Sequence, residues 1–181
     1  HANSLLEKNG DEVYKSMKNI KAGGLTNKIG ISIYDFKMLD KILNRFKFDI
    51  VQAPLNIFDR RLIESGLLNK LKKRKIEIHV RSIFLQGVLL LKFNQLPKNL
   101  KKINKKWMLW EYWLKQNKLD SLQACLSFIL NQKKLNGIVV GYNSKKQLSK
   151  FLKFKKEKNN FFIPNFKIKN KNLTDPRNWL N

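Results

Sequence analysis

The sequence has little cysteine, few acidic residues and no long apolar run. Its one cysteine, Cys125, excludes an internal disulfide and a cluster of metal-binding thiolates. The longest apolar stretch, 83–91, is interrupted by Gln86 and Gly87 and is far shorter than the roughly 20 residues that a membrane-spanning helix needs. The N-terminus also lacks the basic and then apolar order of a signal peptide. We therefore expect a cytoplasmic protein without a membrane span, and we expect Cys125, inside the segment LQACLSFIL, to lie in the core.

The scarcity of acidic residues leaves a large positive charge. Asp and Glu number 13 against 38 Lys and Arg, which gives a formal net charge of +25. Such a charge is typical of proteins that bind nucleic acid. Most of the basic residues are lysine, however, whereas arginine is the side chain that forms paired hydrogen bonds with phosphate and guanine. The lysines are also spread over every segment, so we interpret them as a solvated surface and expect no nucleic-acid partner. A face that binds a polyanion is the alternative.

Short apolar runs alternate with longer amphipathic ones along the chain. The short runs predict strands, and the amphipathic runs, with apolar residues at helical spacing, predict helices. The expected strands cover 27–34, 48–54, 76–84 and 137–142, and the expected helices cover 11–24, 35–46, 60–75, 100–117, 120–132 and 144–154. This order is typical of a parallel α/β sheet with right-handed crossovers. Because an eight-stranded barrel needs roughly 250 residues, the 181 residues predict one domain that is either a small open sheet or part of a barrel.

Polar side chains stand at the expected ends of two of these strands. Parallel α/β folds place their ligand sites beyond the carboxyl ends of the strands. Ser32 lies in the segment ISIY, near the end of one strand, and Gln52 lies within the otherwise apolar segment IVQAP. A buried amide without a partner costs about 1–3 kcal/mol, so Gln52 must bind something. Its amide suits the carboxamide of a nicotinamide ring, and a hydrogen bond to the neighbouring backbone is the alternative.

The segment IVVGYNSKKQL predicts a strand, a turn at Gly141 and the start of a helix. Ser144 and Gln147 have the spacing of a capping box. Backbone N–H groups at such a helix start, with Lys145 and Lys146 beside them, would form a phosphate site. An ordinary capped helix explains the same residues. The sequence contains neither a Walker loop nor a GxGxxG fingerprint.

Other residues that attract attention have structural explanations. The aromatic run WMLWEYW places Trp107, Trp110 and Trp113 on one face of a helix, which indicates packing rather than a platform for stacking bases. His79 lies within a strand, and we expect a structural role for it. No pair of carboxylates and no Ser-His-Asp arrangement is evident.

Taken together, the chain resembles the aldo/keto reductase family over nearly its whole length. The resemblance is carried by the histidine at position 1 and by the segments GLTNKIGISIY, FDIVQAPLNIFDRR, IEIHVRSIFLQGVLLL, IVVGYNSKKQL and DPRNW. It implies a partial (β/α)8 TIM barrel that runs from the end of barrel strand four onward, with the N-terminal strands missing. It also implies reduction of aldehydes or ketones by NADPH or NADH, without metal or flavin.

The resemblance assigns roles to individual residues. His1 would belong to a catalytic tetrad of Asp, Tyr, Lys and His, of which the tyrosine is the general acid. The first three would precede His1, so the chain alone is expected to be inactive. Ser32 and Gln52 would hold the nicotinamide carboxamide, and Arg81, Ser82 and Leu85 would line the ring and the pyrophosphate. The adenosine phosphate would be surrounded by Gly141, Tyr142, Asn143, Ser144 and Gln147.

The sequence departs from the family pattern at several of these positions. Ile33 stands where many members have Asn, and Arg81 stands where many stack a tyrosine on the nicotinamide. Phe151 falls where many members have an Asn that contacts adenine. Gln147 stands where members often have an arginine that pairs with the 2′-phosphate. The choice between NADPH and NADH therefore stays open. The segments LNIFDRR and FLQG resemble a branch associated with sugar metabolism, and a small basic module that binds a polyanion and a non-catalytic subunit of a complex are the alternatives.

Overall fold

A computed structural model describes residues 2–154 and 162–179 of the chain. These residues form two compact units. The first unit consists of His1–Pro54, Arg61–Arg81 and Lys134–Val139, and the second consists of Leu55–Arg60, Ser82–Lys133 and Val140–Asn181. His1 lies outside the described residues. The expectation of one domain over 1–181 stays a prediction.

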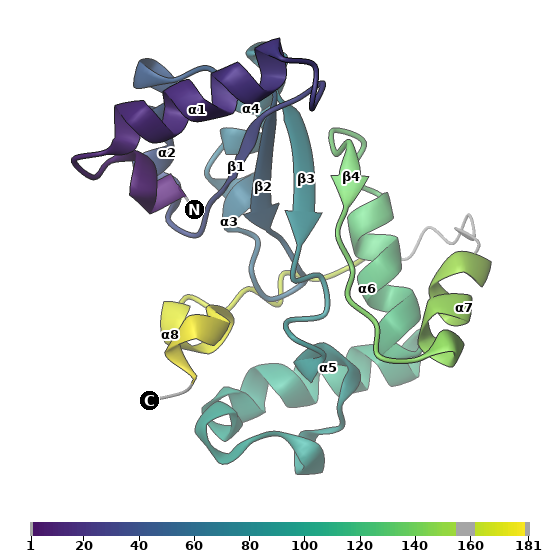
Figure 1. Cartoon of the computed structure of the whole chain (residues 1–181). Coiled ribbons are helices and arrows are strands. Elements are labelled where there is room, and N and C mark those ends of the chain that lie inside the picture. The colour runs from purple at the N-terminus through teal and green to yellow at the C-terminus, as the bar shows by residue number, and fades with distance from the viewer. Residues whose placement is uncertain (1, 155–161, 180–181) are drawn as a thin grey trace. The chain divides into compact units, whose positions relative to one another are not determined.

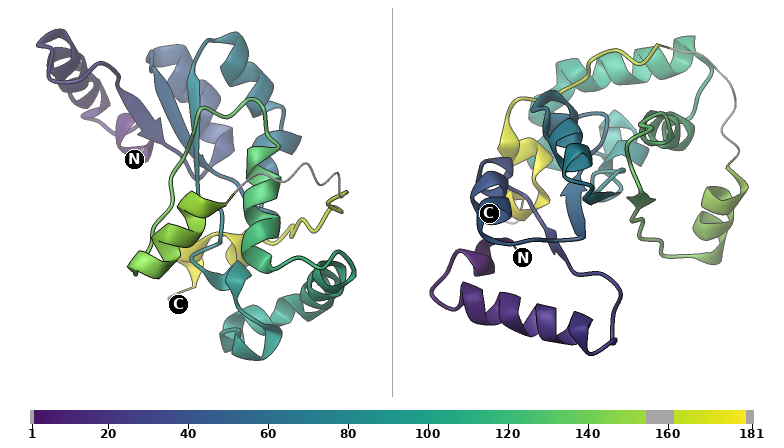
Figure 2. Two further views of the ribbon diagram at one scale, coloured as in Figure 1. Left: turned by 90° about the vertical axis from the view of Figure 1, so that its right-hand side faces the viewer. Right: turned by 90° about the horizontal axis from the view of Figure 1, so that it is seen from above.

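The first unit contains a sheet of four parallel strands, in the order β1-β2-β3-β4 (Figures 1 and 2). The strands are β1 (Gly30–Ser32), β2 (Ile50–Pro54), β3 (Glu77–Arg81) and β4 (Gly137–Ile138). Val51, Ala53, Ile78 and Val80 are fully buried on one face of the sheet. The alternate residues of the same strands, on the opposite face, are mostly half-buried. This opposite face carries the polar side chains of interest.

The edge strands are shorter than the sequence predicts. Strands were expected over 27–34 and 137–142, and the structure has three residues in β1 and two in β4. Each of these strands lies at an edge of the sheet and has one neighbour. The β1 strand ends at Ser32, opposite Gln52, two residues before β2 ends. The N–H of Val139 still bonds to the carbonyl of Val80, at 2.7 Å, and beyond that point β3 itself ends.

The helices of the first unit follow the predicted amphipathic pattern. They are η1 (Ala2–Leu5), α1 (Gly10–Ala22), α2 (Phe36–Arg45), α3 (Arg61–Glu64) and α4 (Leu67–Lys73). The side chain of Asp35 caps α2 by accepting from the N–H of Lys37, and α2 buries Leu39, Ile42 and Leu43. One helix was expected over 60–75, but Gly66 adopts φ +76° and divides it into α3 and α4.

The second unit is built mainly of helices. They are η2 (Val88–Leu90), η3 (Phe93–Gln95), η4 (Lys98–Ile103), α5 (Asn104–Gln116), α6 (Ser121–Leu130), α7 (Lys145–Lys153), α8 (Lys171–Thr174) and η5 (Pro176–Asn178). Trp107 and Trp110 of α5 are fully buried. The rings of Phe58 and Trp107 pack edge to face, with their centroids 5.5 Å apart. This confirms the predicted packing role of these tryptophans. Cys125 of α6 is buried, as expected.

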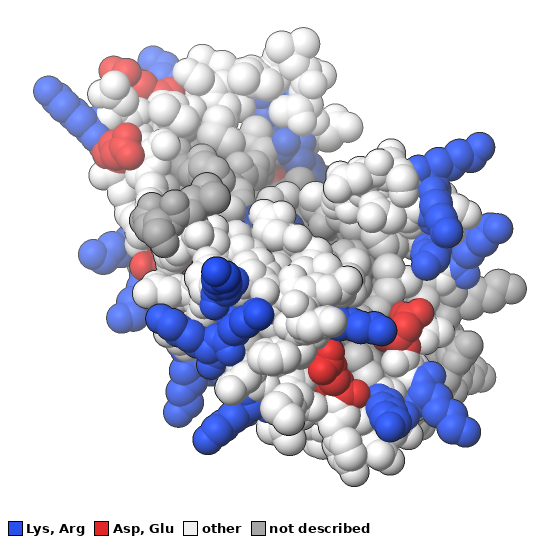
Figure 3. Space-filling model, turned by 90° about the horizontal axis from the view of Figure 1, so that it is seen from below, with Lys and Arg blue, Asp and Glu red and all other residues white. Residues whose placement is uncertain are grey.

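Many basic side chains are exposed at the surface. In the face shown in Figure 3 they project from many places with few acidic groups between them. None of the helices within the described ranges is both long and apolar enough to cross a membrane.

Candidate functional site

Three of the predicted site residues meet at the carboxyl edge of the sheet. The parallel register pairs Ser32 of β1 with Gln52 of β2, and it pairs Pro54 of β2 with Arg81 of β3. Side chains at paired positions of parallel strands point to the same face. Ser32, Gln52 and Arg81 therefore lie on one face of the sheet, where its strands end. The carboxyl ends of β1, β2 and β3 therefore lie at one edge of the sheet.

A continuous row of hydrogen bonds joins these three side chains. The hydroxyl of Ser32 donates to Oε1 of Gln52 at 3.4 Å, and Nε of Arg81 donates to the Ser32 hydroxyl oxygen at 3.3 Å. Nη2 of Arg81 also donates to the carbonyl of Ile33 at 3.1 Å. The guanidinium carbon of Arg81 lies 3.8 Å from the centroid of the Tyr34 ring, which is a close cation–π contact. Gln52 thus bonds to a side chain of the site rather than to the backbone.

Toward the amino ends of the strands, the same face carries an ionic cluster. Gln52 is paired with His79, and His79 is paired with Gly137 of β4. Nε2 of His79 lies 3.6 Å from the Glu77 carboxylate, which also bonds to the ammonium of Lys28. That bond lowers the pKa of Glu77 below its ordinary value. A Cβ at Gly137 would lie 3.0–3.1 Å from the His79 ring, so this glycine makes room for the imidazole. The contacts fit the structural role expected for His79.

In the second unit, the segment after β3 has an unusual backbone. Ser82, Leu85 and Gln86 have φ values of 58°, 48° and 55°, which are rare for residues other than glycine. Backbone strain of this kind often occurs at ligand sites. The Leu85 side chain is fully buried, so a ligand would contact its backbone rather than its side chain. Ser82 is half-buried.

Asn56 holds this segment in place, and the sequence analysis did not single it out. The side chain of Asn56 is buried, and its Nδ2 donates to the carbonyl of Ser82 at 3.0 Å. Its Oδ1 accepts from the N–H groups of Phe58 and Asp59, at 2.9 and 2.8 Å. The only signal in the sequence is a polar residue two positions after Pro54, within an apolar stretch.

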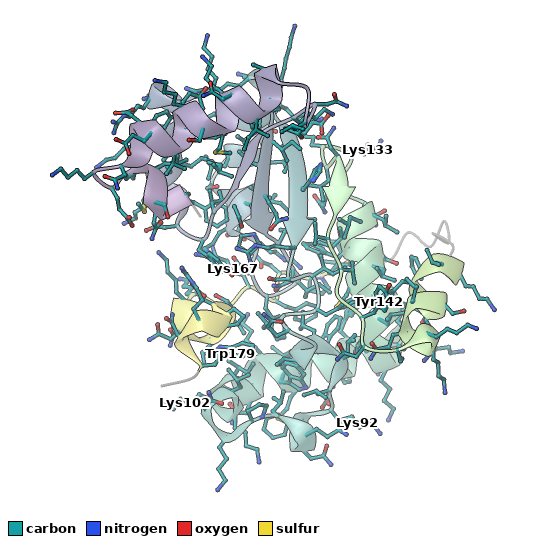
Figure 4. The ribbon with its side chains drawn as sticks, viewed as in Figure 1. Lys92, Lys102, Lys133, Tyr142, Lys167 and Trp179 are labelled. Atoms are coloured by element: carbon teal, nitrogen blue, oxygen red, sulfur yellow. The ribbon has the colours of Figure 1, made fainter. Side chains whose placement is uncertain are left out.

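The predicted phosphate segment forms a capped helix start in the second unit. The hydroxyl of Ser144 accepts from the N–H of Gln147 at 3.2 Å, and Oε1 of Gln147 accepts from the N–H of Asn143 at 2.7 Å. The side chain of Gln147 thus bonds one residue earlier than a standard capping box, which would use the N–H of Ser144. Tyr142 is 53% exposed and precedes α7 (Figure 4). A Cβ at Gly141 would meet open space, so a ligand can approach its backbone.

An aromatic pair joins the two predicted parts of the site that belong to the second unit. The ring of Phe151 in α7 stacks on that of Phe84, with the centroids 5.4 Å apart and the planes at 20°. The helix start at Ser144 and the strained segment after β3 are therefore parts of one packed body. Ser32, Gln52 and Arg81 belong to the first unit. Among the residues that the structure describes, no cluster of His, Cys, Asp and Glu could hold a metal ion.

Comparisons with known proteins agree on one family. The family model described as the aldo/keto reductase family matches residues 7–159. An aldo-keto reductase of Bacillus halodurans in its apo form is 17% identical with a TM-score of 0.60, and the match covers 77% of this chain and 49% of that one. A thermostable aldo-keto reductase solved with the inhibitor epalrestat is 20% identical with a TM-score of 0.54, covering 77% and 47%.

A third solved structure is the glycerol dehydrogenase of Gluconobacter oxydans, which is 16% identical with a TM-score of 0.52, covering 77% of this chain and 51% of that one. The chain thus spans about half the length of the structures that it matches. No curated protein sequence matches the chain. At these identities the solved structures establish the fold, a partial (β/α)8 barrel whose four parallel strands alternate with helices.

Proposed function

The chain belongs to the aldo/keto reductase family, and from this premise we propose that it supplies the NAD(P)H-binding part of a barrel that reduces aldehydes or ketones. One observation carries the proposal. The hydroxyl of Ser32 and the amide of Gln52 are hydrogen-bonded to each other at the carboxyl edge of a parallel sheet, where barrels of this class bind their ligands.

The residues at this edge fit a nicotinamide dinucleotide. A carboxamide both donates and accepts hydrogen bonds, and the Ser32–Gln52 pair offers partners for both. When bound in its reduced form, the dihydronicotinamide ring would supply the hydride that reduces the carbonyl carbon. We assign the ring and the pyrophosphate to Arg81, Ser82 and the backbone of Leu85.

The start of α7 fits the adenosine phosphate. Its capping bonds leave backbone N–H groups of the first turn directed out of the helix, and Lys145 and Lys146 are exposed beside them. We assign this phosphate to Gly141, Tyr142, Asn143, Ser144 and Gln147. Because Gln147 carries no charge, the assignment does not favour NADPH over NADH. A sugar-derived carbonyl compound is the substrate class that we propose.

We further propose that the general acid is not one of the tyrosines of this chain. The hydroxyl of Tyr14, on α1, donates to the backbone carbonyl of Lys47 at 2.9 Å. The ring of Tyr34 is covered by Arg81. Tyr112 on α5 and Tyr142 before α7 are exposed at the surface. The Asp, Tyr and Lys of the family's tetrad would come from residues that precede His1, which would be the fourth member, so the chain corresponds to the C-terminal part of the barrel.

Two measurements test this proposal. The first is the coding sequence upstream of His1, which should encode four further β/α units with an Asp, a Tyr and a Lys at strand ends. A tyrosine replaced by another residue would instead indicate a non-catalytic subunit. An upstream region without such units would contradict the proposal.

The second measurement is a titration of the 181-residue chain, and of any longer protein encoded with it, with NADPH and NADH. Replacing Gln52 by Ala should weaken binding by about ten-fold, the equivalent of one hydrogen bond of roughly 1.4 kcal/mol. Gln116→Ala, at the exposed end of α5, is the control and should bind as the parent protein does. Salt-dependent retention on nucleic acid without dinucleotide binding would contradict the proposal and favour a polyanion-binding module.

A further inference from the structure

We propose that Arg81 acts through Ser32 to fix the orientation of the Gln52 amide, so that Gln52 presents its NH2 group to a ligand and keeps its carbonyl oxygen for Ser32. Arg81 is thus a positioning residue. The inference rests on the proposed function for the identity of the ligand, and on the contacts of the first unit for the orientation itself.

The first step is the bond from Arg81 to Ser32. A guanidinium carries N–H donors and no acceptor, and it stays protonated at any ordinary pH. At the 3.3 Å contact between Nε of Arg81 and the Ser32 hydroxyl oxygen, Arg81 must be the donor. The hydroxyl hydrogen of Ser32 therefore points elsewhere.

The second step is the bond from Ser32 to Gln52. A serine hydroxyl has one hydrogen, and the side-chain atom of Gln52 that lies 3.4 Å from it is assigned as Oε1. The two ends of an amide are told apart only by the bonds they make, and the hydrogen of the Ser32 hydroxyl favours an acceptor. A hydroxyl that already accepts from Arg81 is best matched by an acceptor on its other side. The carbonyl oxygen of Gln52 is the acceptor, so its NH2 group is the end left for a ligand.

The third step is the anchoring of Arg81 itself. Its Nη2 donates to the carbonyl of Ile33 at 3.1 Å, and its guanidinium lies 3.8 Å from the Tyr34 ring centroid. These contacts hold the guanidinium group of Arg81 with its Nε directed at Ser32. The parallel register places Ser32 and Gln52 side by side on the same face, within reach of each other.

The chemical consequence is selection of one kind of ligand atom. An NH2 group recognises an oxygen acceptor, so the site prefers a carbonyl or carboxylate oxygen. For a nicotinamide ring, the carboxamide oxygen rather than its nitrogen would face Gln52, which fixes the rotation of the carboxamide.

The orientation can be measured without any ligand. In the 13C,15N-labelled chain, the chemical shift of the Gln52 Cδ reports whether its oxygen accepts a hydrogen bond. Arg81→Met removes the donor, Ser32→Ala removes the relay, and Arg81→Lys keeps a donor. We expect the Gln52 Cδ and NH2 signals to move in the same direction in Arg81→Met and Ser32→Ala, and to stay near the parent values in Arg81→Lys.

Arg74→Met is the matched control. Arg74 also donates to a backbone carbonyl of the first unit, that of Leu43, and contacts Asn44 rather than Gln52. It should leave the Gln52 signals in place. Gln52 signals that do not change in Arg81→Met would overturn the inference, whatever the effect of Ser32→Ala. If Arg81→Met does not fold, Arg81→Gln takes its place, and the Gln52 signals should move in it as they do in Ser32→Ala.

Dinucleotide analogues test the consequence for binding. The 3-acetylpyridine analogue keeps the carbonyl oxygen and lacks the amide nitrogen, whereas the thionicotinamide analogue replaces the oxygen by a weakly accepting sulfur. The parent protein should bind the first analogue about ten-fold more tightly than the second. Arg81→Met should reduce the ratio of the affinities for the two analogues.

The outcomes separate the two proposals. Equal weakening of all three dinucleotides in Arg81→Met would mean that Arg81 contributes only to the structure or to a direct contact with the dinucleotide, and it would refute the inference. No binding of any dinucleotide, together with the predicted changes in the Gln52 signals, would reject the proposed function and leave the orientation of Gln52 established.

Discussion

The carboxylate of Asp49 accepts hydrogen bonds from the ammonium of Lys21, at 2.7 and 2.6 Å from its two oxygens. It also accepts from the backbone N–H of Ile29 at 2.8 Å. Lys21 lies near the end of α1, and Ile29 directly precedes β1, so one side chain joins a helix to the edge of the sheet. The bond to Lys21, then that to Ile29, lowers the pKa of Asp49 below its ordinary value.

This contact predicts a pH-dependent contribution to stability. Because the pKa of Asp49 is lower in the folded state than in the unfolded state, its stabilisation is present above the unfolded value, about 3.9, and is lost as the pH falls through the folded value. Asp49→Asn should lower the free energy of unfolding by about 1 kcal/mol near neutral pH. Urea unfolding over a pH series should show the difference shrinking in acid. Asp11→Asn, which breaks the exposed pair with Arg45, should have little effect at any pH; equal behaviour of the two variants would refute the prediction.

Gly30 is predicted to tolerate no side chain. A Cβ at this position would lie 2.6 Å from the carbonyl oxygen of Ile50 and 2.9 Å from its Cβ, inside the pairing of β1 with β2. Gly30→Ala should therefore lower the free energy of unfolding by about 1–3 kcal/mol, measured by thermal or urea unfolding. Gly141→Ala is the control, because a Cβ there meets nothing within 4 Å. A Gly30→Ala protein as stable as the control would contradict the β1–β2 register.

The role of Asn56 can be tested by a change of one atom. Asn56→Asp replaces the Nδ2 donor by an oxygen that faces the carbonyl of Ser82 and has no proton to share at neutral pH. We expect a loss of about 1–3 kcal/mol in the free energy of unfolding. Asn104→Asp, at the exposed start of α5, should cost nothing, since a negative charge suits a helix N-terminus. A neutral Asn56→Asp would show that the bond to Ser82 is dispensable.

Cys125 is predicted to be unreactive in the folded protein. The thiol is buried in α6, and burial raises its pKa well above the ordinary value, so the reactive thiolate is scarce. A thiol reagent at neutral pH should modify it no faster than the chain unfolds, and denaturant should release the full reactivity. In the Gly30→Ala protein too, the rate at which the reagent modifies Cys125 should follow the unfolding rate. Fast modification of the native chain would mean that α6 opens locally.

The sequence predicted the order and the type of the elements with good accuracy. Apolar spacing is a local property, so α1, α2, α5 and α6 appear where periodicity placed them, and the four strands follow in the expected order. The departures arise where a local pattern is interrupted or needs a partner. Gly66 divides one expected helix, and the two edge strands β1 and β4, each with a single neighbour, are shorter than predicted.

The strand-end residues were found for the same local reason. Ser32 and Gln52 are polar within apolar strands, a pattern visible without coordinates. Asn56 has a similar pattern but was overlooked, because its partner Ser82 lies 26 residues away along the chain.

By itself, therefore, the sequence determined that the chain is an alternating parallel α/β protein with polar groups at its strand ends, because side-chain hydrophobicity and spacing act over a few residues. Only the tertiary structure decided that Arg81 reaches Ser32, 49 residues earlier, and through it Gln52. That choice follows from the register of three parallel strands, which brings distant side chains to one face at hydrogen-bonding distance.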